Sequence, residues 1–442
     1  MNTYSLQFFT ASLLSVAIAG CSSGSSNPLT AIQAAQAKNA GNFTTTVFLG
    51  DSLTAGYQSG SLLDTQQVHG WAPLVAAQAS FSIVQPLIAY PGAPNVLQLV
   101  SVLNPSGPVI TAAPGITTGR DNFAAQATDL AVPGANVNDV ANTVPLIAPT
   151  TGQQQLNQLV LGYPGLGYGQ AYSQATFAIK ANPTTIFLWI GNNDALIADI
   201  TGMPSTMTTV ANFTSQYTAL IQELTTQTTA HLVIANIPDV TAVPYLQPAA
   251  SILAQASAAT GYPAATLSAI LGIAPGDFVN PTGTAEIPLI LAGARKGPIT
   301  DSGVLSAAEV VTVKAQVTAF NQVIAQQATA AGATLVDINA LFQQVTTSGL
   351  TINGFPGTAS FLGGFFSLDG IHPTNTGYGV VANKFIDTMN ATNATKIPDI
   401  NLSTIAATDP LWPTNLLTTT HGHVIMPSNA GKSLDILFPP QQ

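Results

Sequence analysis

Short runs of β-branched and apolar residues alternate with helical patterns along most of this chain. Strands are expected at residues 44–49, 128–132, 185–190, 231–237 and 334–338. Strands that alternate with helices favour βαβ units and a parallel sheet. The run at 185–190 is continuously apolar, as expected for a strand covered on both faces, whereas 128–132 is the weakest of the five. The sequence therefore predicts an α/β fold around a parallel sheet.

The clearest helix is expected at residues 307–331. Ser306 and Glu309 have the spacing of a capping box, and Gly332 stands where a C-terminal cap belongs. Apolar residues at spacings of three and four indicate one further helix around 210–224, and a last helix is expected at 377–389. These helices fall between or after the expected strands, as a βαβ arrangement requires.

Two connections are longer than a compact fold usually needs. Residues 58–123 separate the first two strands and are rich in Pro and Gly, and residues 241–303 are mostly apolar and rich in Ala and Pro. Such insertions often form lids or binding walls, and an additional packing layer is an equally good interpretation. The folded domain is expected at 44–390. The C-terminal tail, 391–442, shows little periodicity and is expected to wrap the surface.

Charged residues are scarce. The chain has nine Lys and Arg against 19 Asp and Glu, only 6% of 442 residues, and a net charge of −10. A hydrophobic content of 46% excludes disorder through excess charge. The few scattered cations cannot follow a polyanion, so we expect no nucleic-acid partner. A surface covered by uncharged polar residues is interpreted as that of an extracytoplasmic protein.

The single cysteine, Cys21, follows an apolar run at residues 13–20. That run is too short to span a bilayer and suits the hydrophobic part of a secretory signal. Ile18-Ala19-Gly20-Cys21 resembles a bacterial lipobox, although residues 1–10 contain no Lys or Arg. The interpretation is a signal peptide at 1–20 and a lipidated tether and lead-in at 21–43. An ordinary signal peptide with an incidental cysteine is the alternative. We expect an outer-membrane lipoprotein facing the periplasm or exterior, held to the membrane by its lipid alone.

Four segments with polar or flexible residues follow expected strands or precede the last helix. Ser52 lies in Gly50-Asp51-Ser52-Leu53, just after the first strand, and Gly134 follows the second. Asn193 lies in Gly191-Asn192-Asn193-Asp194 after the third. Asp369 and His372 lie in Asp369-Gly370-Ile371-His372-Pro373 before the last helix. Open α/β sheets place their sites at the carboxyl ends of the strands, so these residues are expected at one edge.

Together these segments offer the parts of a nucleophilic site. A serine hydroxyl is a weak nucleophile and needs a neighbouring base, and histidine is the usual base near neutral pH. Taken alone, Ser52 is better explained as a helix N-cap. The other three segments change that interpretation, because they add a carboxylate, an imidazole and hydrogen-bond donors at the same edge.

The four segments resemble those of the SGNH/GDSL hydrolases in order and placement, over about residues 44–389. The resemblance implies a flavodoxin-like, three-layer α/β/α sandwich around a five-stranded parallel sheet. It implies that Ser52 is the nucleophile, His372 its base and Asp369 the group that orients the imidazole. The backbone N–H groups of Ser52 and Gly134, with the Asn193 amide, would form an oxyanion hole.

The resemblance also implies supporting roles. Asp51 and Asp194 match positions that support the site through hydrogen bonds. Asn136 is expected to cap a helix rather than bind substrate, and Asn192 is interpreted as a turn residue. No cofactor or metal is expected. His421 and His423 could hold a metal, but no third ligand lies nearby in the sequence, so a solvated loop is favoured.

The expected reaction is hydrolysis of a carboxylic ester, by a lipase or carboxylesterase, through an acyl-enzyme. Residues 287–292 are apolar and are expected to wall an acyl site, whereas His69 and Trp71 are expected to pack in the core rather than line a pocket. Carbohydrate O-acetyl esterases and acyltransferases share the scaffold, so the fold does not choose among them. A non-catalytic surface-binding lipoprotein is a further alternative, which the intact Ser52, Asp369 and His372 argue against.

Overall fold

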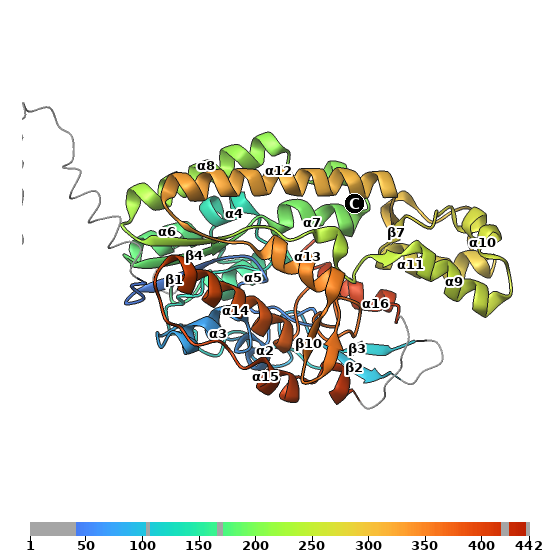
Figure 1. Ribbon diagram of the computed structural model, residues 1–442, viewed down its shortest axis with the longest axis horizontal. Coiled ribbons are helices and arrows are strands. Elements are labelled where there is room, and N and C mark those ends of the chain that lie inside the picture. The colour runs from blue at the N-terminus through green and yellow to red at the C-terminus, as the bar shows by residue number, and fades with distance from the viewer. Residues whose placement is uncertain (1–40, 103–106, 166–170, 417–423, 439–442) are drawn as a thin grey trace, which may run out of the picture. The chain divides into compact units, whose positions relative to one another are not determined.

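A four-stranded parallel sheet lies at the centre of the protein (Figure 1). The computed structural model describes residues 41–102, 107–165, 171–416 and 424–438. The sheet order is β1-β4-β5-β9. All residues of β1, β4 and β5 are buried, which explains their continuous apolar runs. The strand bounds are β1 Thr46–Gly50, β4 Thr185–Trp189, β5 His231–Ala235 and β9 Thr334–Val336.

The predicted α/β fold with a parallel sheet is confirmed, but the expected fifth strand at 128–132 is reduced to a single parallel bridge between Phe48 and Asp129. The segment still runs beside β1, since the Leu130 amide donates to the Phe48 carbonyl at 2.9 Å. The pairing ends at the Val132 amide, which donates to the Gly50 carbonyl at 3.2 Å, because Pro133 has no N–H to continue the ladder.

Side chains that alternate along β4 enter two different cores. Ile186 and Leu188 pack in one core with residues of α8 and α12, whereas Phe187 and Trp189 pack in the other with residues of α3 and α14. Figure 1 shows α8 and α12 on one side of the sheet and α3 and α14 on the other. The result is the predicted three-layer sandwich. The helix bounds are α3 Trp71–Gln78, α4 Val137–Asn142, α5 Gly152–Leu161, α6 Gln174–Lys180, α7 Asn192–Thr201, α8 Val210–Gln227, α12 Ala307–Ala331, α13 Ile338–Ser348 and α14 Asn375–Thr392.

The long helix α12 has the predicted ends. The Ser306 side chain accepts a hydrogen bond from the Glu309 backbone N–H, and the Glu309 side chain accepts one from the Ser306 backbone N–H. These two bonds make a reciprocal capping box. Gly332 ends the helix in the left-handed region, at φ 62°. The local sequence is sufficient to predict both ends of α12, because each cap is made by residues within four positions of the helix.

The first long connection is partly a core layer. It contains α2 (Asp64–Gln67), α3 and an antiparallel hairpin of β2 (Leu97–Ser101) and β3 (Val109–Ala112). Trp71 of α3 is fully buried and stacks on Phe385 of α14, with ring centroids 4.0 Å apart. The expectation that Trp71 packs in the core is therefore confirmed.

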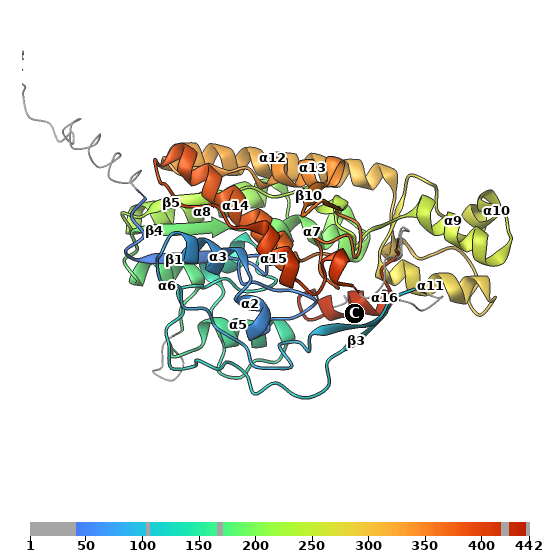
Figure 2. The same ribbon diagram turned by 60° about the horizontal axis from the view of Figure 1, so that its bottom comes forward.

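The second long connection has a small core of its own. Its helices are α9 (Ala249–Thr260), α10 (Ala264–Leu271) and α11 (Pro281–Leu291), and its strands β6 (Gln247–Pro248), β7 (Phe278–Val279) and β8 (Val304–Leu305) form an antiparallel sheet. Ile287, Ile290 and Leu291 pack in that core. Figures 1 and 2 both show α9 and α10 beyond the end of the central sheet. The expected acyl wall at residues 287–292 is therefore wrong.

Residues after Asn390 contribute buried side chains as well as surface. Trp412 and Met426 are each 1% exposed. The buried carboxylate of Asp409 accepts hydrogen bonds from both the backbone N–H and the hydroxyl of Thr376, at 2.7 Å each, at the start of α14. Short helices α15 (Leu402–Thr408) and α16 (Ser428–Gly431) and the hairpin of β10 (Leu350–Ile352) and β11 (Phe355–Gly357) complete this region.

None of the helices in the described residues is long and apolar enough to cross a membrane. Cys21 lies outside the described residues, as do His421 and His423.

Asp129 makes stability depend on pH. Its carboxyl is completely buried, one of its oxygens has no hydrogen-bond partner among the described residues, and burial raises its pKa from 3.8 to about 8. Between these values the folded chain holds a proton that the unfolded chain has lost. The contribution of Asp129 to the free energy of unfolding therefore falls as pH rises from about 4 to about 8.

We predict that Asp129→Asn raises the free energy of unfolding relative to wild type more at pH 8 than at pH 5. Urea unfolding at the two pH values measures this difference. Asp121→Asn, at an exposed carboxylate, controls for the loss of one negative charge. An equal effect of Asp129→Asn at both pH values would show that Asp129 is already ionised in the fold.

Candidate active site

Three elements bring the sequence-predicted residues to one end of the sheet. Ser52 follows β1, Asn193 lies in the first turn of α7 after β4, and Asp369 and His372 lie in the loop that precedes α14. These segments meet because parallel strands all end at the same edge. The loop of Asp369 is closed by hydrogen bonds from the Ser367 amide to the His372 carbonyl and from the Gly370 amide to the Ser367 carbonyl.

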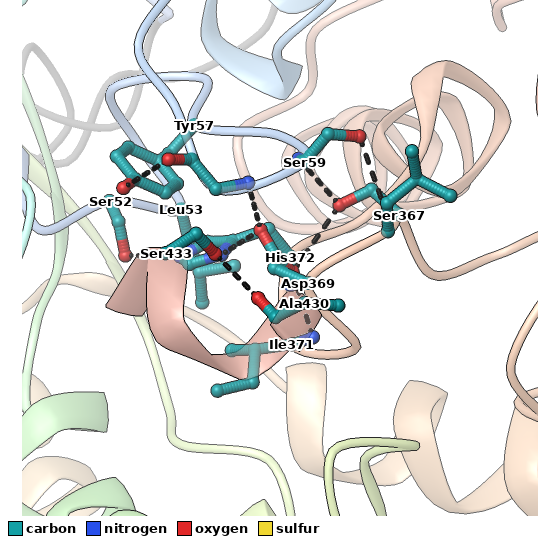
Figure 3. Close-up of polar contacts among 12 residues, drawn as sticks. Ser52, Leu53, Tyr57, Ser59, Ser367, Asp369, Ile371, His372, Ala430 and Ser433 are labelled. Atoms are coloured by element: carbon teal, nitrogen blue, oxygen red, sulfur yellow. Dashed lines mark hydrogen bonds and ion pairs between the residues drawn. The ribbon is translucent and has the colours of Figure 1, made fainter. Parts of the chain in front are cut away.

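A continuous hydrogen-bond chain joins three buried side chains (Figure 3). The Ser52 hydroxyl lies 2.7 Å from His372 Nε2, and His372 Nδ1 lies 3.0 Å from Asp369 Oδ2. Their exposed fractions are 4%, 1% and 0% respectively. The imidazole is therefore held between a hydroxyl and a carboxylate, an arrangement in which it can accept a proton from the hydroxyl.

The Asp369 carboxylate also accepts backbone hydrogen bonds. Oδ1 accepts the amides of Ile371 and His372, at 2.9 Å each, and Oδ2 accepts the amide of Gly60 at 2.7 Å. Burial alone would raise the pKa of Asp369, but the charge and hydrogen bond of His372 and these backbone donors lower it below its ordinary value. Asp369 is thus a carboxylate that can balance a positive charge on the imidazole.

Residues that the sequence did not point to connect the Ser52 loop with the Asp369 loop. The Ser367 hydroxyl accepts the Ser59 amide at 2.8 Å and lies 3.4 Å from Asp369 Oδ1. The Tyr57 ring packs on the His372 ring at a centroid distance of 4.6 Å. Figure 3 shows Tyr57, Ser59 and Ser367 grouped around the imidazole and carboxylate. No local sequence signal marks these contacts, because more than 300 residues separate the two loops.

The expected oxyanion donors lie in three segments, two of which, the Gly134 loop and α7, are hydrogen-bonded to each other. Neither the Ser52 nor the Gly134 amide donates a hydrogen bond to any described residue. The Asn193 amide group donates to the Ala135 carbonyl at 2.8 Å, which ties α7 to the Gly134 loop. Ser52 and Asn193 line the same cavity, whereas Gly134 is not among its lining residues.

The Gly134 loop is fixed at three further points. Gln153 Nε2 donates to the Pro133 carbonyl at 2.6 Å, and Asp194 Oδ2 accepts the amide of Val137, the first residue of α4, at 3.0 Å. Asn136 caps α4 in a reciprocal capping box, as expected from the sequence. Gly134 itself has φ 80°, and a Cβ there would lie 2.5 Å from the Gln153 side chain, so only glycine fits. Gln153 is a positioning residue that the sequence did not reveal.

Two more carboxyls lie beside the site. Asp51 accepts the Leu53 amide at 3.0 Å and Asn192 Nδ2 at 2.8 Å, so Asn192 does more than form a turn. Burial raises the pKa of Asp51 to about 6 and that of Asp194 also to about 6, although the hydrogen bonds of each carboxylate oppose this change. Both side chains join segments on either side of the site, which fits the expected supporting interpretation.

A model of the GDSL-like lipase/acylhydrolase family matches residues 46–385. The chain belongs to this family. It is therefore a carboxylic ester hydrolase, and the matched range includes every expected site residue from Asp51 to His372.

Distant matches to solved structures accompany the family match. LAE5, an α/β hydrolase enzyme from the metagenome of Lake Arreo, Spain, is 11% identical with a TM-score of 0.36, over 80% of this chain and 99% of that chain. The acetylxylan esterase Axe2 from Geobacillus stearothermophilus is 12% identical with a TM-score of 0.35, over 79% and 96%. Phospholipase A1 from Streptomyces albidoflavus NA297 is 14% identical with a TM-score of 0.33, over 79% and 100%. At these TM-scores none of them indicates a substrate. A search of curated proteins found no match.

In this GDSL-family chain, a narrow apolar cavity of about 90 Å³ adjoins Ser52 and His372. Its lining includes the apolar stripe of α13 together with Val380 and Val381 of α14. Phe342 of α13 meets Phe366 edge to face at 5.7 Å. The apolar residues that line the cavity are Leu53, Trp189, Leu196, Pro238, Val240, Val243, Ile338, Leu341, Phe342, Val345, Phe365, Phe366, Ile371, Pro373, Val380 and Val381.

The remaining histidines lie elsewhere. His231 Nε2 lies 2.8 Å from the Thr334 hydroxyl, between the first residues of β5 and β9. The expectation that His69 packs in the core is wrong: its half-buried side chain lines a different, open cleft with Gln66 and Tyr90. Within the described residues, no group of three or more His, Cys, Asp or Glu side chains could hold a metal ion.

We predict that Asn193→Ala lowers kcat by about 10²–10³ while KM changes only a few-fold, because an oxyanion donor acts mainly on the transition state. Steady-state kinetics on a soluble p-nitrophenyl ester measures both constants. Gln153→Ala is the matched control, since it removes one support of the Gly134 loop and no proposed donor, and it should lower kcat less. A near-wild-type kcat for Asn193→Ala, or a loss confined to KM, would remove Asn193 from the oxyanion hole.

Proposed function

We propose that this GDSL-family protein is a serine esterase or lipase that forms an acyl-enzyme on Ser52 and prefers apolar acyl groups. The observation that carries the proposal is the hydrogen-bond chain from Ser52 through His372 to Asp369, beside an apolar cavity. A serine hydroxyl needs such a base, and the base needs an orienting partner.

In the first half-reaction His372 Nε2 accepts the Ser52 proton as the hydroxyl oxygen attacks the ester carbonyl. The carbonyl oxygen becomes negatively charged and accepts hydrogen bonds from the Ser52 and Gly134 amides and the Asn193 side chain. Asp369 stabilises the imidazolium. His372 then gives its proton to the leaving alkoxide, and the alcohol departs.

In the second half-reaction water attacks the acyl-enzyme. His372 accepts a proton from the water and returns it to Ser52 as the carboxylic acid leaves. The low exposure of Ser52, His372 and Asp369 supports this cycle, since charges interact more strongly where water is excluded. No step requires a cofactor.

The cavity favours one substrate class. Its walls are apolar side chains from α13, α14 and the segment after β5, whereas an acetyl group would use only a small part of this surface. We therefore favour a lipase or carboxylesterase over a carbohydrate O-acetyl esterase or an acyltransferase. Burial of each acyl methylene stabilises the bound ester by about 0.8 kcal/mol.

Ser52→Ala should abolish hydrolysis of p-nitrophenyl esters from acetate to palmitate, because no other hydroxyl contacts His372 Nε2 within the described residues. Initial rates across the series, with near-ultraviolet circular dichroism as a check on folding, test this. The matched control is Ser433→Ala, at a serine whose hydroxyl donates to the Ala430 carbonyl and which should keep activity. Wild type without turnover on any ester would favour a binding role, and turnover retained by Ser52→Ala would place the nucleophile elsewhere.

We further propose that the enzyme acts outside the cytoplasm of a bacterium, anchored through a lipid on Cys21. The apolar run at residues 13–20 before the only cysteine supports this, together with the low content of charged residues. A single cysteine at the lipobox position also leaves the chain without an intrachain disulfide.

Cys21→Ser should move the protein from the membrane fraction to the soluble extracytoplasmic fraction, because the proposed anchor has no other attachment point. Fractionation of expressing cells, followed by an esterase assay of each fraction, measures the change. Persistence of the variant in membranes would reject the lipid anchor, and labelling of wild type with radioactive palmitate would support it independently.

A further inference from the structure

Two separate hollows in the protein have two lining residues in common, which we call the partition. The first is the apolar cavity at Ser52, and the second is a larger cleft of about 560 Å³ lined by polar and apolar residues. Only Val243 and Val345 line both. The cleft is also lined by Lys314 and by residues of the β10–β11 region, including Thr358 and Ser360.

The two valines come from different elements and belong to the same apolar core. Val243 directly follows the short helix η3 (Val240–Ala242), and Val345 lies near the end of α13. Their exposed fractions are 7% and 8%. Neither side chain has a polar atom, so the partition offers apolar surface and no side-chain hydrogen bond to either hollow.

The apolar stripe of α13 runs along the cavity as far as this partition. Ile338, Leu341, Phe342 and Val345 stand at i, i+3, i+4 and i+7, so they share one helix face, and all four line the cavity. Seven residues of helix span about 10 Å. The α13 lining of the cavity therefore covers about two turns of the helix, and Val345, its last residue, is also the first α13 residue that lines the cleft.

We propose that Val243 and Val345 are the end wall of the acyl site and set the longest acyl chain that binds fully inside it, with the cleft beyond as the space that a longer chain would enter if the wall were cut back. This inference rests on the proposed function, since it assigns the cavity to the acyl group of an ester. It assigns specificity to two residues that lie outside the four site segments of the sequence.

The experiment measures kcat/KM for p-nitrophenyl esters of increasing acyl length, from acetate to palmitate. In wild type kcat/KM should rise about fourfold for each methylene that leaves water, then stop rising at a certain length, the breakpoint. Val345→Ala and Val243→Ala should each move the breakpoint to longer chains. Val345→Phe should move it to shorter chains by filling the end of the cavity.

Val381→Ala is the matched control, because Val381 lines the cavity but not the cleft. It should leave the breakpoint at the wild-type length, whatever its effect on individual rates. Because the breakpoint is read within each variant, a general loss of stability or rate does not move it. The enlarging and filling variants shift it in opposite directions, so failure of one to fold still leaves the other as a test.

An unmoved breakpoint in Val345→Ala, Val243→Ala and Val345→Phe would overturn the end-wall assignment while leaving the esterase proposal intact. Wild type that cleaves none of the esters would instead overturn the proposed function. A shift in Val381→Ala equal to that of the partition variants would also contradict the inference, since it would mean that any enlargement of the cavity has the same effect.

Discussion

The buried carboxylate of Asp369 is the interaction on which the rest of the site depends. A carboxylate without exposure to water is costly unless donors surround it, and here the Gly60, Ile371 and His372 amides and the His372 ring supply them. One of these donors belongs to the Ser52 loop and the others to the His372 loop. The same contacts that stabilise the charge of Asp369 therefore fix the Ser52 loop and the His372 loop relative to each other.

A second set of contacts positions the proposed oxyanion-hole donors, just as the contacts of Asp369 position the base. Asn193 and Asp194, adjacent at the start of α7, bond to Ala135 and Val137 on either side of the α4 cap, and Gln153 bonds to Pro133. The Gly134 amide is thus positioned by a frame of hydrogen bonds from α7 and Gln153 rather than by contacts within its own loop. Since its pKa is raised to about 6, Asp194 titrates in a range where this frame can respond to pH.

Much of this could be predicted from sequence because the signals are local. The caps of α12 lie within a few residues, and the site segments each follow or precede an element with a clear pattern, so their meeting at one sheet edge follows from parallel topology. The fifth strand is reduced to one bridge at Asp129, and Pro133 has no N–H to extend its pairing with β1. The apolar segment 287–292 was assigned to an acyl wall although it packs in a separate core, since composition does not say which core an apolar helix joins. Gln153, Ser367 and the α13 wall are defined by contacts between distant residues, which no local pattern reports.

The central claim is that Ser52 attacks the ester, activated by His372 and Asp369. Peptide mapping by mass spectrometry after incubation with a fluorophosphonate tests it most directly, because such a reagent bonds to an activated serine and the bond survives digestion. The account predicts one adduct per chain, on Ser52. An adduct on another residue, or continued ester turnover by protein in which Ser52 is modified, would contradict it.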